Sequence, residues 1–240
     1  MKKRKELLEA FTQEPLDLLV IGGGITGAGV ALDAQVRGLK TGLIEMRDFA
    51  SGTSSRSTKL VYGGLQFFKQ MDVKHVSEVS KERAIVYENA PHVIRPEWML
   101  LPFYKDGPFS RLTTSLGLKV YERFAAVKKN ERRHMLTKKQ AIQAEPLLSA
   151  DRLKGAGLYV EYRTDDARLT IETIKEAVRR GTKALNYLKV ESYLYEEGQA
   201  VGVVAVNQLT GEALKIYARK IVNATGPWLD RLREQDRSKK

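Results

Sequence analysis

The chain of 240 residues is 42% hydrophobic, which is enough to build one large domain or two small ones around a hydrophobic core. It has no cysteine, which excludes disulfides and thiolate metal sites, and no apolar run reaches the length of a signal peptide or a membrane span, so we expect a cytoplasmic protein. The 41 Lys and Arg against 29 Asp and Glu give a net charge of +12 and a pI near 9.7, which favours anionic partners such as phosphate ligands, acidic lipid or nucleic acid.

The first elements form a strand, helix, strand unit. Residues 1–16 are predicted as an N-terminal arm, followed by a strand over Leu18–Ile21 whose adjacent apolar residues are typical of a buried parallel strand. The Ala- and Val-rich stretch Ile25–Arg37 predicts a helix that ends at Gly38. A second short strand over 41–45 completes the unit, and its crossover should be right-handed.

The middle of the chain mixes helices and strands. Valines at helical spacing predict a helix within 72–90. The stretch 97–104 reads as a strand, and Pro102 places it at the edge of a sheet. Between Gly107 and Glu145, helical patterns alternate with basic loops.

The last third predicts a helix followed by a meander. The helix is capped by Thr164 or Asp165 and ends at Gly181. Alternating polar and apolar residues from 188 onward, with turn signals between them, predict a three-stranded meander and then a separate, buried last strand over Lys220–Ala224.

The glycines between the first strand and helix follow the spacing Gly22-x-Gly24-x-x-Gly27. This spacing gives a tight turn, close approach of the backbone to a pyrophosphate, and a helix N-terminus for its charge. Glu45 ends the second strand, where a carboxylate can accept hydrogen bonds from a ribose diol, and it disfavours an extra 2′-phosphate. The pattern therefore predicts a dinucleotide site rather than an accidental glycine turn, and it fits NAD and FAD equally.

The next segment, "DFASGTSSRSTKLVYGG" at 48–64, differs from an NAD-binding domain, which would continue with another helix and parallel strand. Its hydroxyl groups and Lys59 offer many short donors to further phosphate and a ring system. A solvated Ser/Thr loop is the other interpretation of such a composition.

Three stretches together resemble the FAD-dependent glycerol-3-phosphate dehydrogenase and oxidase family: 45–65, "TDDARLT" at 164–170, and "KIVNATGPWLDRL" at 220–232. The resemblance implies an α/β fold, in which a Rossmann-like FAD-binding domain with a parallel sheet and a β-meander is interrupted by part of an α+β substrate domain. After the arm, it implies an FAD-binding domain over 17–90 and 161–230, a substrate or cap domain part over 91–160, and an end segment over 231–240.

The resemblance also implies which residues bind FAD. The pyrophosphate, the adenosine and the flavin side would be contacted by Gly22, Gly24, Ile25, Thr26, Gly27, Glu45, Met46, Thr53, Ser54, Ser57, Lys59, Leu60, Val190, Ala224, Thr225 and Gly226. Among these, Glu45 would bind the adenosine ribose, and Val190 would lie by the adenine through its backbone.

The family carries His-Gly-Gly-Leu-Arg-Tyr beside the flavin, where this chain has Tyr62-Gly63-Gly64-Leu65-Gln66-Phe67. Tyr62 and Gln66 thus stand at the catalytic positions without the proton-accepting histidine or the phosphate-binding arginine, so we expect weakened chemistry. The family also continues beyond the point corresponding to residue 240, so we expect this chain to be truncated.

The activity implied by the resemblance is FAD-dependent oxidation of sn-glycerol 3-phosphate to dihydroxyacetone phosphate, with quinone or oxygen as electron acceptor. The alternative is a non-catalytic flavoprotein fragment that at most binds a nucleotide. The family's association with membranes makes the basic run 128–134 a candidate for peripheral contact with acidic lipid at the inner face of the cell membrane.

The remaining candidates are weaker. Asp165 and Asp166 form a carboxylate pair, but their place before a helix favours capping. The three histidines lack ligand spacing, so no metal site is expected. Trp228 is expected in core or cofactor packing, and no nucleic-acid partner is expected because no recognition helix or aromatic-basic interleaving is present.

Overall fold

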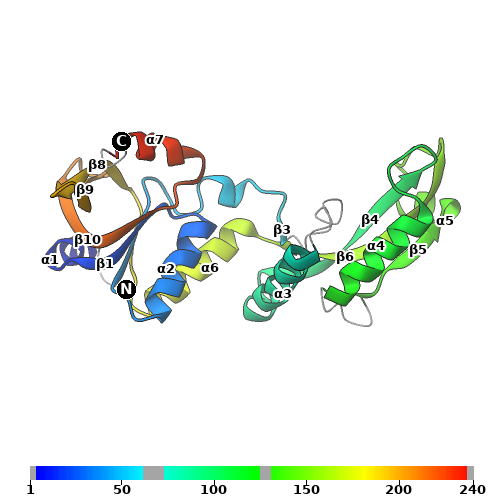
Figure 1. Cartoon of the computed structure of the whole chain (residues 1–240), viewed down its shortest axis with the longest axis horizontal. Coiled ribbons are helices and arrows are strands. Elements are labelled where there is room, and N and C mark those ends of the chain that lie inside the picture. The colour runs from blue at the N-terminus through cyan, green and yellow to red at the C-terminus, as the bar shows by residue number, and fades with distance from the viewer. Residues whose placement is uncertain (1–3, 62–72, 125–130, 237–240) are drawn as a thin grey trace. The chain divides into compact units, whose positions relative to one another are not determined.

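In the computed structural model, residues 4–61, 73–124 and 131–236 are described, and the chain divides into two compact units (Figure 1). The discontinuous unit comprises Met1–Ser57 and Asp165–Lys240, and the inserted unit comprises Thr58–Thr164. None of the helices within the described ranges is long and apolar enough to cross a membrane.

The discontinuous unit is built on a six-stranded sheet in the order β7-β2-β1-β10-β9-β8. The strands are β1 (Leu16–Ile21), β2 (Thr41–Ile44), β7 (Lys183–Leu185), β8 (Leu188–Glu196), β9 (Gln199–Asn207) and β10 (Ala213–Asn223). The first four in the sheet order run parallel, whereas β10, β9 and β8 form an antiparallel meander. This confirms the predicted α/β class with a parallel sheet and a meander.

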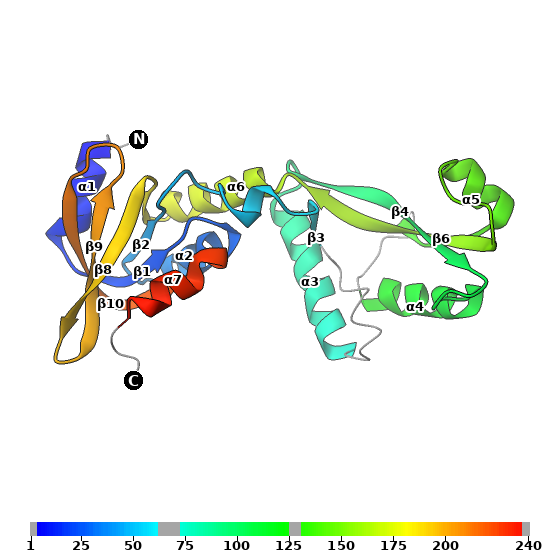
Figure 2. The ribbon, with the colours of Figure 1, turned by 90° about the horizontal axis from the view of Figure 1, so that it is seen from above.

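Helices cover the sheet because β1 alternates its side chains between the two faces. Val20 packs with Ala28 and Ala31 of α2 (Ile25–Val36) and Ile174 of α6 (Asp166–Arg179). Figures 1 and 2 show α2 and α6 side by side on this face. Leu19 belongs to the opposite core, which includes the buried Phe11 of α1 (Arg4–Gln13) and apolar residues of the meander.

The N-terminal arm is a helix rather than an irregular segment, because α1 (Arg4–Gln13) is anchored by tertiary contacts. Phe11 is 0% exposed and fills the core on the meander side. The Arg4 guanidinium donates hydrogen bonds to the carbonyl oxygen of Asn186 at 2.8 Å and to the side chain of Asn207 at 3.2 Å. Burial lowers the pKa of the Arg4 guanidinium, whose Nη2 donates both of these hydrogen bonds.

The predicted last strand is not a separate strand. Ala213–Asn223 is one continuous strand, β10, whose first half pairs antiparallel with β9 and whose second half pairs parallel with β1. The part over 220–223 is exposed to half-buried rather than buried. The alternation of the meander therefore continues into the parallel sheet without a turn.

The inserted unit holds a second sheet in the order β3-β6-β4, with β5 also paired to β6. Its elements are β3 (Leu60–Val61), α3 (Val73–Asn89), β4 (Ile94–Tyr104), α4 (Arg111–Phe124), β5 (His134–Thr137), α5 (Lys138–Ala144) and β6 (Leu153–Thr164). The predicted edge position of the strand carrying Pro102 is confirmed, because β4 pairs along its length with β6 and ends the sheet order.

Three strands of the inserted unit were not anticipated from the sequence: the short β3, β5 and the long central β6. The face of β6 carries a buried ion pair, in which Arg83 Nη1 of α3 lies 3.1 Å from Glu161 Oε2. Their side chains are only 2% and 1% exposed, and the guanidinium also lies over the Tyr162 ring at 4.5 Å. This pairing compensates the cost of placing two charges in the interior.

Candidate functional site

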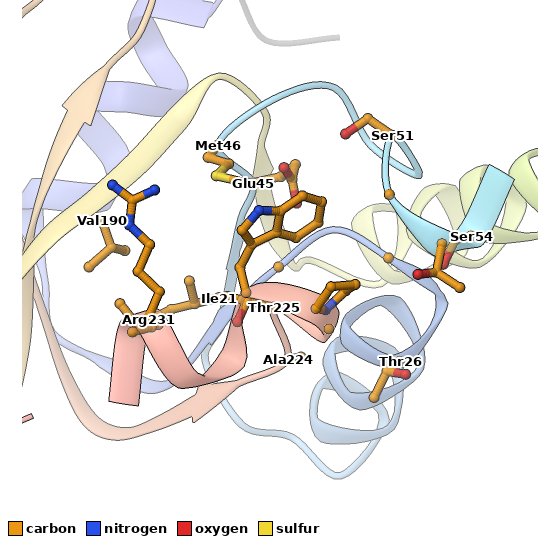
Figure 3. A pocket seen from close by; sticks show the side chains of 18 of the residues that line it. Ile21, Thr26, Glu45, Met46, Ser51, Ser54, Val190, Ala224, Thr225 and Arg231 are labelled. Atoms are coloured by element: carbon orange, nitrogen blue, oxygen red, sulfur yellow. The ribbon is translucent and has the colours of Figure 1, made fainter. Parts of the chain in front are cut away.

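A cavity of about 330 Å³ opens in the discontinuous unit where β1, β2 and β10 end (Figure 3). Its walls come from the glycine turn and the start of α2, from the end of β2, from residues 51–54, from the start of β8 and from residues 224–235. The carboxyl edge of a parallel sheet is where α/β proteins bind ligands, and the volume lies within the range of small-molecule sites.

Close packing of the backbone requires glycine at two positions of this turn. Gly22 has φ +113°, and a Cβ added there would lie 2.5 Å from the carbonyl oxygen of Ala224. A Cβ on Gly27 would lie 1.9 Å from the carbonyl oxygen of Gly22, so only glycine lets α2 begin this close to the turn. The positive end of α2 consequently faces the cavity, as an anionic ligand requires.

Glu45 joins the glycine turn to the end of β2. Its Oε2 accepts a hydrogen bond from Gly23 N at 2.8 Å, and its Oε1 accepts one from Arg47 N at 2.8 Å. These bonds fix the carboxylate at the cavity wall, which it lines in a half-buried position. Each oxygen retains a further lone pair, so the group can still accept hydrogen bonds from two hydroxyls.

The hydroxyl-rich segment is tied to the turn and to α6. Ser54 Oγ accepts a hydrogen bond from Ile25 N at 2.9 Å, at the first residue of α2. Ser57 donates from its backbone N and its Oγ to Asp166 Oδ2, at 3.1 and 2.7 Å. These bonds hold residues 54 and 57 in place, and residues 51–54 form a wall of the cavity.

The acidic pair at the start of α6 is structural. Asp165 is the N-cap, with its Oδ1 accepting from Arg168 N at 3.0 Å, which confirms the predicted capping. Asp166 is buried and holds Ser57, so its carboxylate anchors the hydroxyl-rich segment rather than acting in acid-base chemistry.

The structure brings together most residues that the sequence predicted for the cofactor. Those lining the cavity are Gly22, Gly24, Ile25, Thr26, Glu45, Met46, Thr53, Ser54, Val190, Ala224, Thr225 and Gly226. Gly27 packs beneath the turn and Ser57 contacts α6. Lys59 and Leu60 belong to the inserted unit, where they begin the pairing with β6, and Tyr62 and Gln66 lie outside the described residues.

Sequence reasoning missed much of the wall that follows β10. Arg231 and Gln235 line the cavity without having been predicted, as do Ser51, Gly52, Leu188 and Lys189, and Trp228 lines it too. Trp228 was expected in core or cofactor packing; its ring lies over Gly52 and 5.4 Å from the Arg47 guanidinium. The spacing of Trp228, Arg231 and Gln235, three and four residues apart, was the available helical signal.

The short helix α7 (Leu229–Glu234) carries this wall and is fixed at two points. Leu232 is 7% exposed and belongs to the meander-side core. Just past the helix, Asp236 Oδ1 accepts a hydrogen bond from Tyr195 Oη on β8 at 2.7 Å. Burial raises the pKa of the neighbouring Tyr193 phenol to about 12, with the Asp236 charge adding to the shift. The end of α7 is thereby held against the meander.

A parallel sheet with a glycine turn, a carboxylate at the end of the second strand and a following meander defines a Rossmann-like, dinucleotide-binding class of protein. The sequence profile of the FAD dependent oxidoreductase family matches residues 17–240, and the chain belongs to this family.

Individual relatives indicate a narrower group within this family. Aerobic glycerol-3-phosphate dehydrogenase of Bacillus subtilis is 62% identical over 237 residues, which are 99% of this chain and 43% of that protein. The enzyme of the same name from Staphylococcus aureus is 55% identical over 98% of this chain and 42% of its own length. The chain is therefore homologous to glycerol-3-phosphate dehydrogenases and spans less than half the length of these relatives.

Solved structures agree with the fold. Glycerol-3-phosphate dehydrogenase from Bacillus halodurans, complexed with FAD, has a TM-score of 0.77 and 55% identity, covering 98% of this chain and 39% of that one. L-proline dehydrogenase from P. horikoshii has a TM-score of 0.71 at 23% identity, covering 93% of this chain and 56% of that one. The second likeness concerns the fold alone.

Proposed function

We propose that the discontinuous unit binds FAD in this cavity and that the chain forms the N-terminal part of an enzyme that oxidises sn-glycerol 3-phosphate. The observation that carries the proposal is the glycine turn held by Glu45, because it presents a helix N-terminus and a ribose acceptor to one cavity. The homology to glycerol-3-phosphate dehydrogenases supports the choice of cofactor and substrate.

The residues present fit the cofactor's parts. Gly22 and Gly24 line the cavity without side chains of their own, and the start of α2 stabilises the pyrophosphate charge. Glu45 accepts hydrogen bonds from the ribose hydroxyls. Met46 and Val190 supply apolar contact for the adenine, while Ser54 and Thr53 lie on the side toward the second phosphate.

When bound, the flavin would accept at N5 the hydride from C2 of glycerol 3-phosphate, leaving dihydroxyacetone phosphate, and quinone or oxygen would then take the electrons. The chain's own task is to hold the substrate and take the proton of its C2 hydroxyl. We assign that task to the segment with Tyr62 and Gln66, on the basis of the family resemblance. We also propose that the inserted unit is part of the substrate domain.

A second candidate is a flavoprotein that binds the nucleotide without turnover. It is favoured by Tyr62, Gln66 and Phe67, which replace the His, Arg and Tyr typical of the family. Losing a positioned proton acceptor removes a factor of about 100 to 10,000, and a neutral amide cannot reproduce an arginine's bidentate grip on phosphate.

Calorimetric titration with FAD tests the cofactor. We expect saturable binding that Gly22→Val abolishes, because its side chain would collide with the Ala224 carbonyl at 2.5 Å, while Gly198→Asn on an exposed turn leaves binding intact. An absence of FAD binding in the unsubstituted chain would contradict the proposal.

Anaerobic addition of sn-glycerol 3-phosphate to the FAD-loaded chain separates the two candidates. Bleaching of the flavin's visible absorbance supports the dehydrogenase, whereas binding without bleaching supports the non-catalytic flavoprotein. In that second case, Tyr62→His, Gln66→Arg and Phe67→Tyr should together restore bleaching if this segment holds the substrate.

Contact with acidic lipid at the membrane's inner face stays a prediction for the basic run 128–134, part of which lies outside the described residues. Co-sedimentation with vesicles containing an anionic phospholipid, compared with neutral vesicles, tests it. The expected result is binding that decreases as salt is added, since the attraction between the cations and the surface is screened.

A further inference from the structure

The turn at Asn186 and Tyr187, between β7 and β8, connects the N-terminal helix α1 to one wall of the cavity. Tyr187 has a positive φ of 51°, a left-handed conformation that a residue with a side chain keeps only where its surroundings hold it. Directly after this turn, Leu188 N donates a hydrogen bond to the Glu45 carbonyl oxygen at 2.8 Å. The position of the turn therefore bears on the position of Glu45.

Arg4 holds this turn from the side of α1. Its Nη2 donates hydrogen bonds to the carbonyl oxygens of Asn186 and Tyr187, at 2.8 and 3.3 Å. Its Nη1 donates to Asn186 Oδ1 at 3.1 Å. A guanidinium is planar and rigid, so several bonds from one side chain fix both the place and the orientation of the turn.

On its other side, the same turn holds the segment that follows β2. Tyr187 N donates to the carbonyl oxygen of Arg47 at 2.9 Å, and Asn186 Nδ2 donates to Asp48 Oδ1 at 2.8 Å. Arg47 N in turn donates to Glu45 Oε1 at 2.8 Å. The backbone that orients the Glu45 carboxylate at the cavity wall (Figure 3) is thus itself fixed by the turn.

We propose that Arg4 is a positioning residue for the ribose site, which acts through Asn186 and Tyr187 to keep the Glu45 carboxylate where it accepts hydrogen bonds from the ribose of a bound nucleotide. This inference rests on the proposed binding of FAD. Arg4 is not among the described residues that line the cavity, so its effect on the ligand passes through the turn. An arginine that only anchored α1 would contribute to stability and leave recognition of the ribose unchanged.

The test is calorimetric titration of the 240-residue chain with ADP and with 2′-deoxy-ADP, which differ only in a ribose hydroxyl that a carboxylate at this position binds. We expect ADP to bind at least about tenfold more tightly, because the lost hydrogen bond has a charged acceptor. In Arg4→Met, which keeps a long side chain without donors, this ratio should fall at least about threefold. Arg4→Lys should lower it less, since an ammonium can still donate to the Asn186 carbonyl oxygen.

The ratio removes effects common to both nucleotides, such as partial loss of folding. Arg37→Met is the matched control, because it makes the same substitution at an exposed arginine of the discontinuous unit, which is ion-paired with Asp33 at 2.7 Å. It should keep the unsubstituted chain's ratio. If Arg4 acts through Glu45, Arg4→Met should weaken ADP binding by a smaller factor in a Glu45→Ala chain than in the unsubstituted one.

The outcomes separate this inference from the proposed function. If Arg4→Met binds both nucleotides with the unsubstituted ratio, Arg4 only anchors α1, and the inference is wrong while the proposed function stands. If Arg4→Met does not fold, Asn186→Ala takes its place, because it removes the bridge between Arg4 and Asp48, and an unchanged ratio there is equally contradictory. A ratio near one in the unsubstituted chain also overturns the inference. If that chain binds neither ADP nor FAD, the proposed function itself fails.

Discussion

Two glycines in α2, two residues apart, should respond in opposite ways to the same substitution. A Cβ at Gly27 would lie 1.9 Å from the Gly22 carbonyl oxygen, whereas ordinary contact begins at 3.4 Å, so the helix must withdraw by about 1.5 Å. Both contacting groups are close to the backbone and cannot rotate away. Gly27→Ala should therefore lower the free energy of unfolding by about 3 kcal/mol, the upper end of the cost of over-packing.

Gly29 offers the control. A Cβ added there meets nothing within 4 Å among the described residues, and the position is exposed on the helix. Gly29→Ala should thus stabilise the helix by about 0.5–1 kcal/mol, because alanine loses less backbone entropy on folding. The expected Tm falls by about 6–12 °C for Gly27→Ala and rises by about 1–4 °C for Gly29→Ala.

Thermal unfolding followed by tryptophan fluorescence measures both changes. The chain has two tryptophans, and Trp98→Phe leaves Trp228 as the reporter of the discontinuous unit. FAD affinity should fall at least about tenfold in Gly27→Ala, because the displaced helix N-terminus no longer faces the pyrophosphate. Equal Tm values for the two alanine variants, or undiminished FAD binding in Gly27→Ala, would refute the reasoning.

Substitutions test three other contacts. Glu45→Ala should weaken FAD binding by about 1–3 kcal/mol in a titration, with a smaller loss for Glu45→Gln, and an unchanged affinity would show that the carboxylate does not contact the ribose. Asp165→Ala removes the cap of α6 and should cost about 1 kcal/mol in denaturant unfolding, whereas Asp165→Asn should be nearly neutral. Arg83→Met leaves the Glu161 carboxylate buried and should lower the free energy of unfolding by about 3–5 kcal/mol. The double variant with Glu161→Leu should recover most of this loss. A loss in the double variant as large as in the single one would contradict this account.

Local signals made the first half of the site predictable from sequence. The glycine spacing at 22–27 and the carboxylate at Glu45 fix their own surroundings, because the turn, the helix start and the strand end lie within a few residues of one another. The same holds for α6, which begins at its cap Asp165 and is followed by Gly181 with φ +116°. Such elements depend little on what the rest of the chain does.

β6 was missed because residues far away in the sequence determine why its glycines are needed. Gly157 looks like a turn residue in "LKGAGLYVEYRT", but a Cβ there would lie 2.7 Å from Leu118 Cδ1 on α4. The glycine allows the helix to pack closely on the strand, a requirement that no local pattern contains. Gln235 was missed for a similar reason, since only the packing of Leu232 and the Tyr195 hydrogen bond bring a polar end segment to the cavity.

The pairing of β1 with β10 has a consequence for how the chain folds as it is synthesised. Leu16 lies opposite Ala218, so the central strand pair of the discontinuous unit closes only after β10 has left the ribosome. The strands β4 and β6 of the inserted unit are much closer in sequence and can pair earlier. Until β10 arrives, β1 has an open edge that can pair with other chains. We therefore expect the nascent N-terminal segment to depend on chaperones, and the nucleotide to bind as a late step that traps the closed sheet.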